Sequence, residues 1–170
     1  MATSLETRLA LKLKTIYRST GVDLSTPYDE TTVEKSVTLT DGNGADKAEC
    51  VWTDTITASD AGTTIDVFGG ITDVFGNTLS MAQIKCVYIE NKSTTTGEYI
   101  DVFGAAQAVE IISGSTDTVR IHPEGFILYW ASGAAADSPS PTAGVNDEIL
   151  ITAASAKTPE VDIVIIGENA

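Results

Sequence analysis

TTIDVFGGITDVFGNTLSMAQIKCVYIEN, residues 63–91, is the stretch that decides the fold. In its last part, Ile84–Ile89, two sets of side chains alternate, and a period of two puts them on opposite faces of a strand. Both sets are largely apolar, which is typical of a strand covered on both sides. Gly69–Gly70 offers a point of reversal, because glycine adopts positive φ without a steric penalty. The stretch therefore predicts a short strand, a tight reversal and a buried central strand.

The same alternation recurs along the chain in short runs that turn residues separate. Asp41-Gly42-Asn43-Gly44 is the strongest hairpin signal among those turns. No helical pattern is longer than a turn, so parallel strands joined by helical crossovers are not expected. We predict an all-β fold, an antiparallel β-sandwich or jelly roll of about ten short strands. The other predicted strands are Arg8–Tyr17, Glu34–Leu39, Ala48–Thr57, Tyr99–Phe103, Ala108–Ile112, Val119–Ile121, Phe126–Trp130, Glu148–Thr152 and Val161–Ile166.

Charge limits the partners that the chain can bind. Its 170 residues contain 24 acidic and 10 basic side chains, a net charge of −14. Phosphate backbones and anionic lipid surfaces attract basic proteins, so neither nucleic acid nor membrane is expected as a direct partner. The N-terminus has no apolar signal-peptide region and no apolar run reaches 18 residues. We expect synthesis and folding in a cytoplasm.

The N-terminal segment differs from the rest. Residues 1–32 are predicted to form a strand or arm followed by a loop, and residues 33–170 the β-sandwich domain. Four of the ten basic residues lie between Arg8 and Arg18. Leucines and lysines alternate there, which puts them on opposite faces. The pattern fits an ordinary first strand, and it also fits an arm that docks on an acidic neighbour. The candidate interface residues are Arg8, Leu9, Leu11, Lys12, Leu13 and Lys14.

No residue pattern indicates catalysis. The only histidine, His122, could act as the base of a catalytic triad, but the chain has no G-x-S-x-G nucleophile motif. A zinc site would need more His and Cys ligands than the one histidine and two cysteines of the chain. Any of the 24 carboxylates could pair in space as glycosidases require, but no spacing favours such a pair. We predict no enzyme activity, no catalytic residue, no cofactor and no metal.

The two cysteines, Cys50 and Cys86, lie in apolar strand patterns without CxxC spacing. Buried free thiols are the favoured interpretation, because free cysteine is among the most buried residue types. A disulfide between neighbouring strands remains the alternative.

Two further patterns carry alternatives. The tetrapeptide Asp-Val-Phe-Gly occurs three times, at Asp66–Gly69, Asp73–Gly76 and Asp101–Gly104. We interpret it as a strand-to-turn ending, because glycine readily ends strands. Trp52, Tyr99 and Trp130 could instead serve as stacking platforms of a carbohydrate-binding sandwich. Aromatic side chains exposed in one cleft would favour that function, and buried ones would favour plain core.

An ordered series of short motifs resembles small β-rich virion proteins of tailed bacteriophages. The likeness covers about Leu39 to Gly167, and the order of the motifs carries it. The motifs are Leu39–Ala45, Trp52–Thr55, Thr72–Leu79 followed by Ile84-Lys85, Gly104–Ala106, Asp117–Val119, Pro123–Phe126 and Val161–Gly167. The chain departs from the group in its triple Asp-Val-Phe-Gly and its Ser138-Pro139-Ser140-Pro141 loop.

The resemblance implies a non-enzymatic structural protein of the virion that decorates or cements the capsid shell. Its partners would be the major capsid protein or other virion proteins. It would also form a homo-oligomer, with a trimer favoured. A tail, baseplate or fibre component is the alternative within the virion.

Overall fold

The fold is described from a computed structural model of the chain, which defines residues 4–18, 28–112, 114, 116–133 and 137–170. Its regular elements there are strands, which confirms the all-β prediction. The strands are β1 Thr7–Arg18, β2 Tyr28–Asp41, β3 Lys47–Ala48, β4 Cys50–Thr57, β5 Thr63–Asp66, β6 Phe68–Thr72, β7 Thr78–Asn91, β8 Ile100–Phe103, β9 Thr118–Ile121, β10 Phe126–Trp130, β11 Glu148–Ala153 and β12 Glu160–Asn169.

The predicted central strand is the centre of the larger sheet of the body. β7 pairs antiparallel with β10 on one side and with β12 on the other, and β4 completes the order β10-β7-β12-β4. β6 pairs with the first part of β7. Because β7 and β12 have neighbours on both sides, their apolar residues lie in the middle of the sheet, where burial is greatest.

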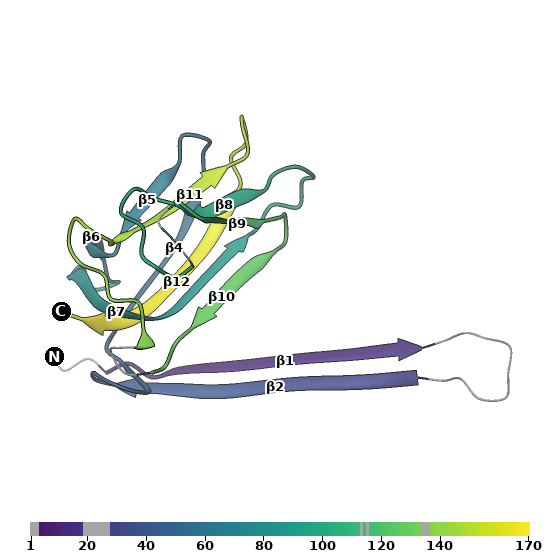
Figure 1. The fold of residues 1–170 in the computed structure, drawn as a ribbon, viewed down its shortest axis with the longest axis horizontal. Coiled ribbons are helices and arrows are strands. Elements are labelled where there is room, and N and C mark those ends of the chain that lie inside the picture. Colours follow the sequence, from purple (N-terminus) through teal and green to yellow (C-terminus); the bar gives the residue numbers. More distant parts are fainter. Residues whose placement is uncertain (1–3, 19–27, 113, 115, 134–136) are drawn as a thin grey trace, which may run out of the picture.

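A second sheet, in the order β5-β11-β8-β9, packs over the first, as Figure 1 shows. The main core lies between the two sheets. Ile89, Ile163 and Ile165 of the larger sheet share it with Ile100 and Ile149 of the smaller one, and all five are at most 1% exposed. The body is therefore the predicted antiparallel β-sandwich.

β1 and β2 form a long arm that leaves the body and runs past its edge (Figure 1). They pair antiparallel over twelve residues, from Thr7 opposite Leu39 to Arg18 opposite Tyr28. A strand rises about 3.3 Å per residue, so the arm is about 40 Å long. The loop predicted before residue 33 ends earlier than expected, because β2 begins at Tyr28. Residues 19–27 of that loop lie outside the described part. The domain boundary expected between residues 32 and 33 lies within β2, so the arm contains residues from both sides of it.

Three local expectations were wrong. The turn Asp41–Gly44 does not close a hairpin, because β3 pairs parallel with the end of β2 and β4 joins β12 in the body. Ala108–Ile112 contains one isolated bridge, from Ala108 to Glu148, and no strand. Gly69–Gly70 lies within β6, where the pairing with β7 is irregular, so the reversal comes at Asp73–Asn77 instead.

Among the described residues, none forms a helix of the length and apolarity that crossing a bilayer requires.

Candidate protein-interaction site

The arm presents an apolar face that the rest of the chain leaves partly uncovered. Residues directly opposite in an antiparallel pair share a face. The pairs Leu9–Val37 and Leu13–Val33 therefore lie together, with Leu11 between them. We call the set Leu9, Leu11, Leu13, Val33 and Val37 the leucine face of the arm.

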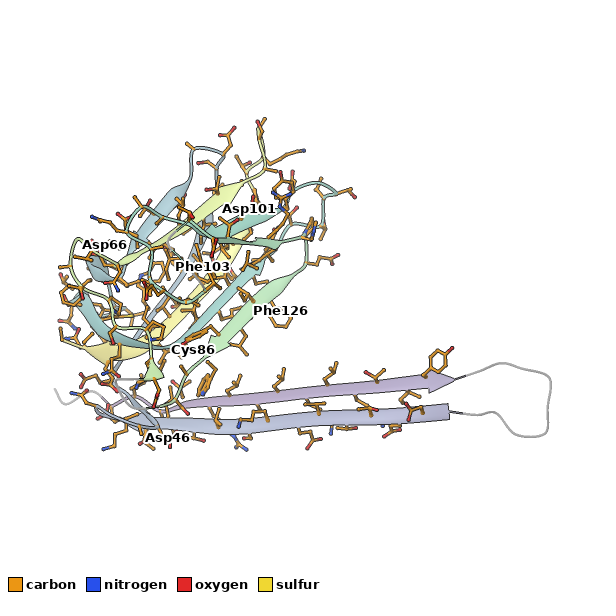
Figure 2. The ribbon with its side chains drawn as sticks, in the orientation of Figure 1. Asp46, Asp66, Cys86, Asp101, Phe103 and Phe126 are labelled. Atoms are coloured by element: carbon orange, nitrogen blue, oxygen red, sulfur yellow. The ribbon has the colours of Figure 1, made fainter. Side chains whose placement is uncertain are left out.

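Exposure on the leucine face increases with distance from the body. Leu39, at the start of the face, is fully buried, whereas Leu11 is 44% exposed, Val33 52% and Leu13 60%. In Figure 2 the side chains of the outer arm extend from the ribbon with no second layer packed on them. A two-stranded ribbon is marginally stable in water on its own, so an arm of this length is expected to pack on another surface.

The opposite face of the arm carries the predicted basic residues, but β2 neutralises part of their charge. Lys12 Nζ lies 2.5 Å from Glu34 Oε1, and Lys14 Nζ lies 3.0 Å from Glu30 Oε1. All four side chains are well exposed, and such pairs contribute only about 0–1 kcal/mol each. The structure thus separates the candidate arm residues into an apolar set and a charged set, as the alternation predicts. It also shows that the lysines are paired within the arm.

The larger sheet has a second apolar surface on the side that faces away from the main core. Leu128, Tyr88 and Val164 lie in one row across β10, β7 and β12. Phe126 lies one row further on, is 58% exposed, and its ring centroid lies 5.8 Å from that of Tyr88. We call Tyr88, Phe126, Leu128 and Val164 the open face. A shallow hollow of about 440 Å³ adjoins it, lined by Thr53, Asp54, Thr55, Tyr88, Asp162, Ile163 and Val164.

The arm is attached to the body at the edge of this open face. Leu39 and Ala48 form a small buried cluster with Cys86 and Ile166, and Leu128 and Val164 pack against it. The arm and the sheet are therefore chemically complementary where they meet. Beyond this attachment the arm continues with its leucine face uncovered.

A buried ion pair holds the turn that follows the arm. Lys85 is fully buried, and its Nζ lies 3.0 Å from Glu168 Oε1 and donates to the Gly133 carbonyl at 2.6 Å. The Gly44 amide donates to the same Glu168 oxygen at 2.7 Å. The Asp46 amide donates to the Ser132 carbonyl at 2.7 Å. These contacts link β7, β12, the turn after β2 and the loop after β10, so the root of the arm is firmly held.

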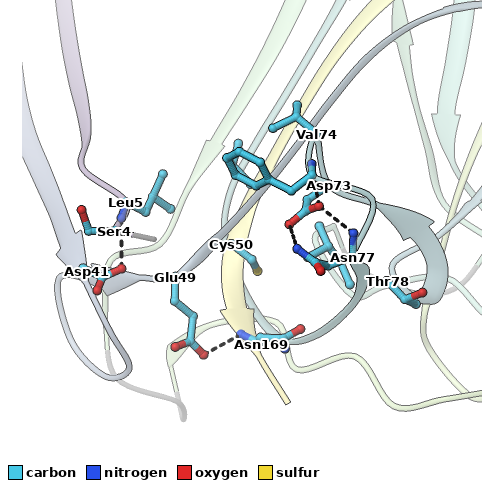
Figure 3. A pocket seen from close by; sticks show the side chains of 13 residues that line it. Ser4, Leu5, Asp41, Glu49, Cys50, Asp73, Val74, Asn77, Thr78 and Asn169 are labelled. Atoms are coloured by element: carbon cyan, nitrogen blue, oxygen red, sulfur yellow. Dashed lines mark hydrogen bonds between the residues drawn. The ribbon is translucent and has the colours of Figure 1, made fainter. Parts of the chain in front are cut away.

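A groove of about 430 Å³ lies on the other side of the arm root, between Leu5, Asp41 and Glu49 and the β6–β7 turn (Figure 3). Asp73 at that turn accepts hydrogen bonds from Asn77 and the Phe75 amide, which lower the pKa of its carboxyl. These bonds hold the turn, whose Val74 and Phe75 are 80% and 73% exposed.

The other candidates from the sequence do not come together. The structure places Trp52 against the main core, and Trp130 packs against the cluster on the opposite side of the same sheet. Tyr99 lies elsewhere, beneath the Arg120 guanidinium, whose central carbon is 3.7 Å from the ring centroid. These three aromatic side chains therefore form no common platform. His122 is exposed, and its ring meets the edge of Tyr99.

Cys50 and Cys86 are both buried and free, as the favoured interpretation predicts. They belong to different clusters on the two faces of the sheet, and β12 lies between their strands, so they cannot form the alternative disulfide. Within the described residues, no cluster of three or more His, Cys, Asp or Glu side chains could hold a metal ion.

Sequence reasoning identified half of the interaction surface. It found the leucines of β1, but not Val33 or Phe126, which complete the two apolar surfaces. Both lie in alternating runs, and alternation alone does not tell an exposed apolar face from a buried one.

Comparisons of the chain with protein-family models, with curated proteins and with solved structures found no match.

Proposed function

We propose that this chain is a non-enzymatic structural subunit that joins a larger protein assembly through its arm. The single observation that carries the proposal is a two-stranded arm, about 40 Å long and firmly rooted in a β-sandwich, whose apolar face is uncovered along its outer part. An isolated hairpin of this kind gains stability when its apolar face is packed. Attachment to a neighbouring protein provides that packing.

Attachment would depend mainly on the leucine face. The lysines of the opposite face are exposed and already paired with Glu34 and Glu30, so they add little. Burial of apolar surface is only weakly affected by moderate salt, whereas exposed ion pairs are screened. Salt should therefore weaken attachment only in part.

We further propose that the assembly is the virion of a tailed bacteriophage, where the chain decorates or cements the capsid shell. The support is the resemblance of Leu39–Gly167 to small β-rich virion proteins, together with a stable β-sandwich body of high negative charge. An acidic subunit remains soluble at high concentration before assembly.

The test is to purify virions of the phage that encodes the chain and to locate the chain by mass spectrometry and electron microscopy. A fixed number of copies per particle, with density on the shell, supports a decoration protein. Density confined to the tail, baseplate or fibres would move the chain to the alternative position. Absence of the chain from gradient-purified virions would contradict the virion proposal.

A further inference from the structure

We infer that the arm of one copy packs its leucine face on the open face of a second copy of this chain. The inference rests on the proposed function and deepens it by naming the partner of the arm. Both surfaces are apolar, partly uncovered and present on every copy: the leucine face on β1 and β2, and the open face on β10, β7 and β12.

The first argument is the contact that already exists within one chain. At its root the arm packs Leu39 on Cys86 and Ile166, next to Leu128 and Val164 of the open face. The outer arm continues the same apolar pattern with Leu11, Leu13 and Val33. Surfaces of this chemistry therefore pack on one another in this protein.

The second argument is reach. The root of the arm is held by the turn contacts around Lys85 and Glu168, and the ribbon then runs past the edge of its own body (Figure 1). Within the described residues, no part of the same body lies over the outer arm, whose Leu13 is 60% exposed. A second molecule can supply a surface that covers Leu13.

Charge favours a copy of the same chain as that molecule. The arm, residues 7–18 and 28–41, contains five basic and four acidic residues, a net charge of +1, whereas residues 42–170 contain 18 acidic and five basic residues, a net charge of −13. Lys35 lies opposite Leu11, on the leucine face, and makes no ion pair with any other described residue. On the open face, Glu90 lies opposite Phe126 and makes no ion pair with another described residue. Asp162 lies in the same row but is already paired with Lys92 at 3.1 Å. An arm from a second copy brings Lys35 to a surface that carries the Glu90 carboxylate.

The contact area is sufficient. The uncovered part of the ribbon, from Leu11 outward, is about 26 Å long and about 10 Å wide, and it covers roughly 260 Å². In a pair that exchanges arms, each copy contributes one arm and one open face and buries about 520 Å², so the pair buries about 1,000 Å² in total, which reaches the lower limit of specific interfaces. Exchange of arms between copies therefore gives a specific oligomer. Only the arm of one copy contacts the body of the other, and the two acidic bodies need not touch.

The experiment uses the full chain and single replacements on each surface. Leu13→Asp puts a charge on the leucine face, and Phe126→Asp puts one on the open face. Ser36→Asp is the matched control on the opposite face of the arm, and Val145→Asp replaces a 65% exposed apolar residue elsewhere on the body. All four positions are exposed, so each variant should keep the circular dichroism of the parent and melt cooperatively.

Sedimentation at concentrations up to about 100 µM gives the number of copies. We expect the parent and both controls to sediment as one oligomer, and Leu13→Asp and Phe126→Asp each to sediment as single copies. An equimolar mixture of these two variants should form mixed pairs, because the arm of Phe126→Asp is intact and so is the open face of Leu13→Asp. These pairs hold one arm-to-face contact and should therefore associate more weakly than the parent.

Three results would overturn the inference. One is a parent chain that stays a single copy, which would assign the arm to a different partner. Another is a Phe126→Asp variant that associates like the parent, which would show that arms pack on each other. The third is a mixture that fails to associate although both variants are folded. The proposed function stands or falls separately, because it is tested by whether the chain is present in virions.

Discussion

At the residue scale, one tetrapeptide shows how strongly context decides conformation. Asp-Val-Phe-Gly occurs at Asp66–Gly69, Asp73–Gly76 and Asp101–Gly104, yet its valine is fully buried twice and 80% exposed once. Its aspartate accepts local backbone amides in the first two copies and pairs with Arg120 in the third. The sequence predicts a strand ending at each copy, but the neighbours that decide burial lie far away in the chain.

Two of the three glycines in these repeats provide a matched test. Gly76 and Gly104 both have positive φ, of 84° and 73°. A Cβ at Gly76 would meet nothing within 4 Å, whereas one at Gly104 would lie 2.6 Å from Thr118 Cγ2. Gly76→Ala should therefore cost only the strain of the left-handed backbone, about 1–2 kcal/mol. Gly104→Ala should cost about 1–3 kcal/mol more for overpacking. Urea denaturation measures both, and equal losses would show that the β8–β9 contact is not tight.

The two thiols should react slowly in the folded protein. Burial raises the pKa of Cys50 to about 12, helped by the Glu49 carboxylate, and the pKa of Cys86 to about 11. Because the thiolate is the reactive form, alkylation at pH 8 should be slower than in denatured protein by roughly a hundredfold for Cys86 and roughly a thousandfold for Cys50. Labelling followed by mass spectrometry measures the two rates. Rapid labelling of one cysteine under native conditions would indicate that its strand opens.

At the scale of elements, β12 is the strand on which the body most depends. It pairs with β7 on one side and with β4 on the other. Its Ile163 and Ile165 side chains, which are 1% and 0% exposed, pack in the main core. Ile163→Ala and Ile165→Ala should each lower the free energy of unfolding by about 2–5 kcal/mol. Val164→Ala, on the opposite face and half-buried, should cost less. Chemical denaturation gives the comparison, and a loss below about 0.5 kcal/mol for either isoleucine would be incompatible with the core described here.

The elements also show what alternation can and cannot predict. Period two located most of the strands, including β7 and β12, because side-chain direction is a local property of the backbone. It could not predict that β2 begins at Tyr28 and pairs with β1 along its whole length, since pairing depends on residues far apart in sequence. For the same reason the turn at Asp41–Gly44 was wrongly predicted to close a hairpin. The lysines of β1 were read as a basic patch, and their partners Glu30 and Glu34 became visible only through the register.

At the scale of the whole molecule, charge and apolar surface are distributed unequally. The body contains most of the negative charge and a complete core, whereas β1 is basic and one face of the arm is apolar without a covering layer. Bodies of like charge repel one another in solution, and an uncovered apolar arm can hold them together. The fold thus places most of the negative charge on the body and the uncovered apolar surface on the arm, the part that we propose gives attachment.

The central claim is that the arm carries association and that the body folds without it. The direct test deletes the whole segment from Leu11 to Lys35, whose end residues pair with each other in the register. Ala10 and Ser36, the next pair, are then joined through an Asn-Gly turn, which closes antiparallel strands well. Sedimentation and thermal melting are then recorded for the full and the shortened chain side by side. The account predicts a shortened chain that is folded, melts cooperatively and sediments as a single copy, beside a parent that is oligomeric and whose melting temperature rises with protein concentration. A shortened chain that is unfolded, or one that still associates as the parent does, would contradict it.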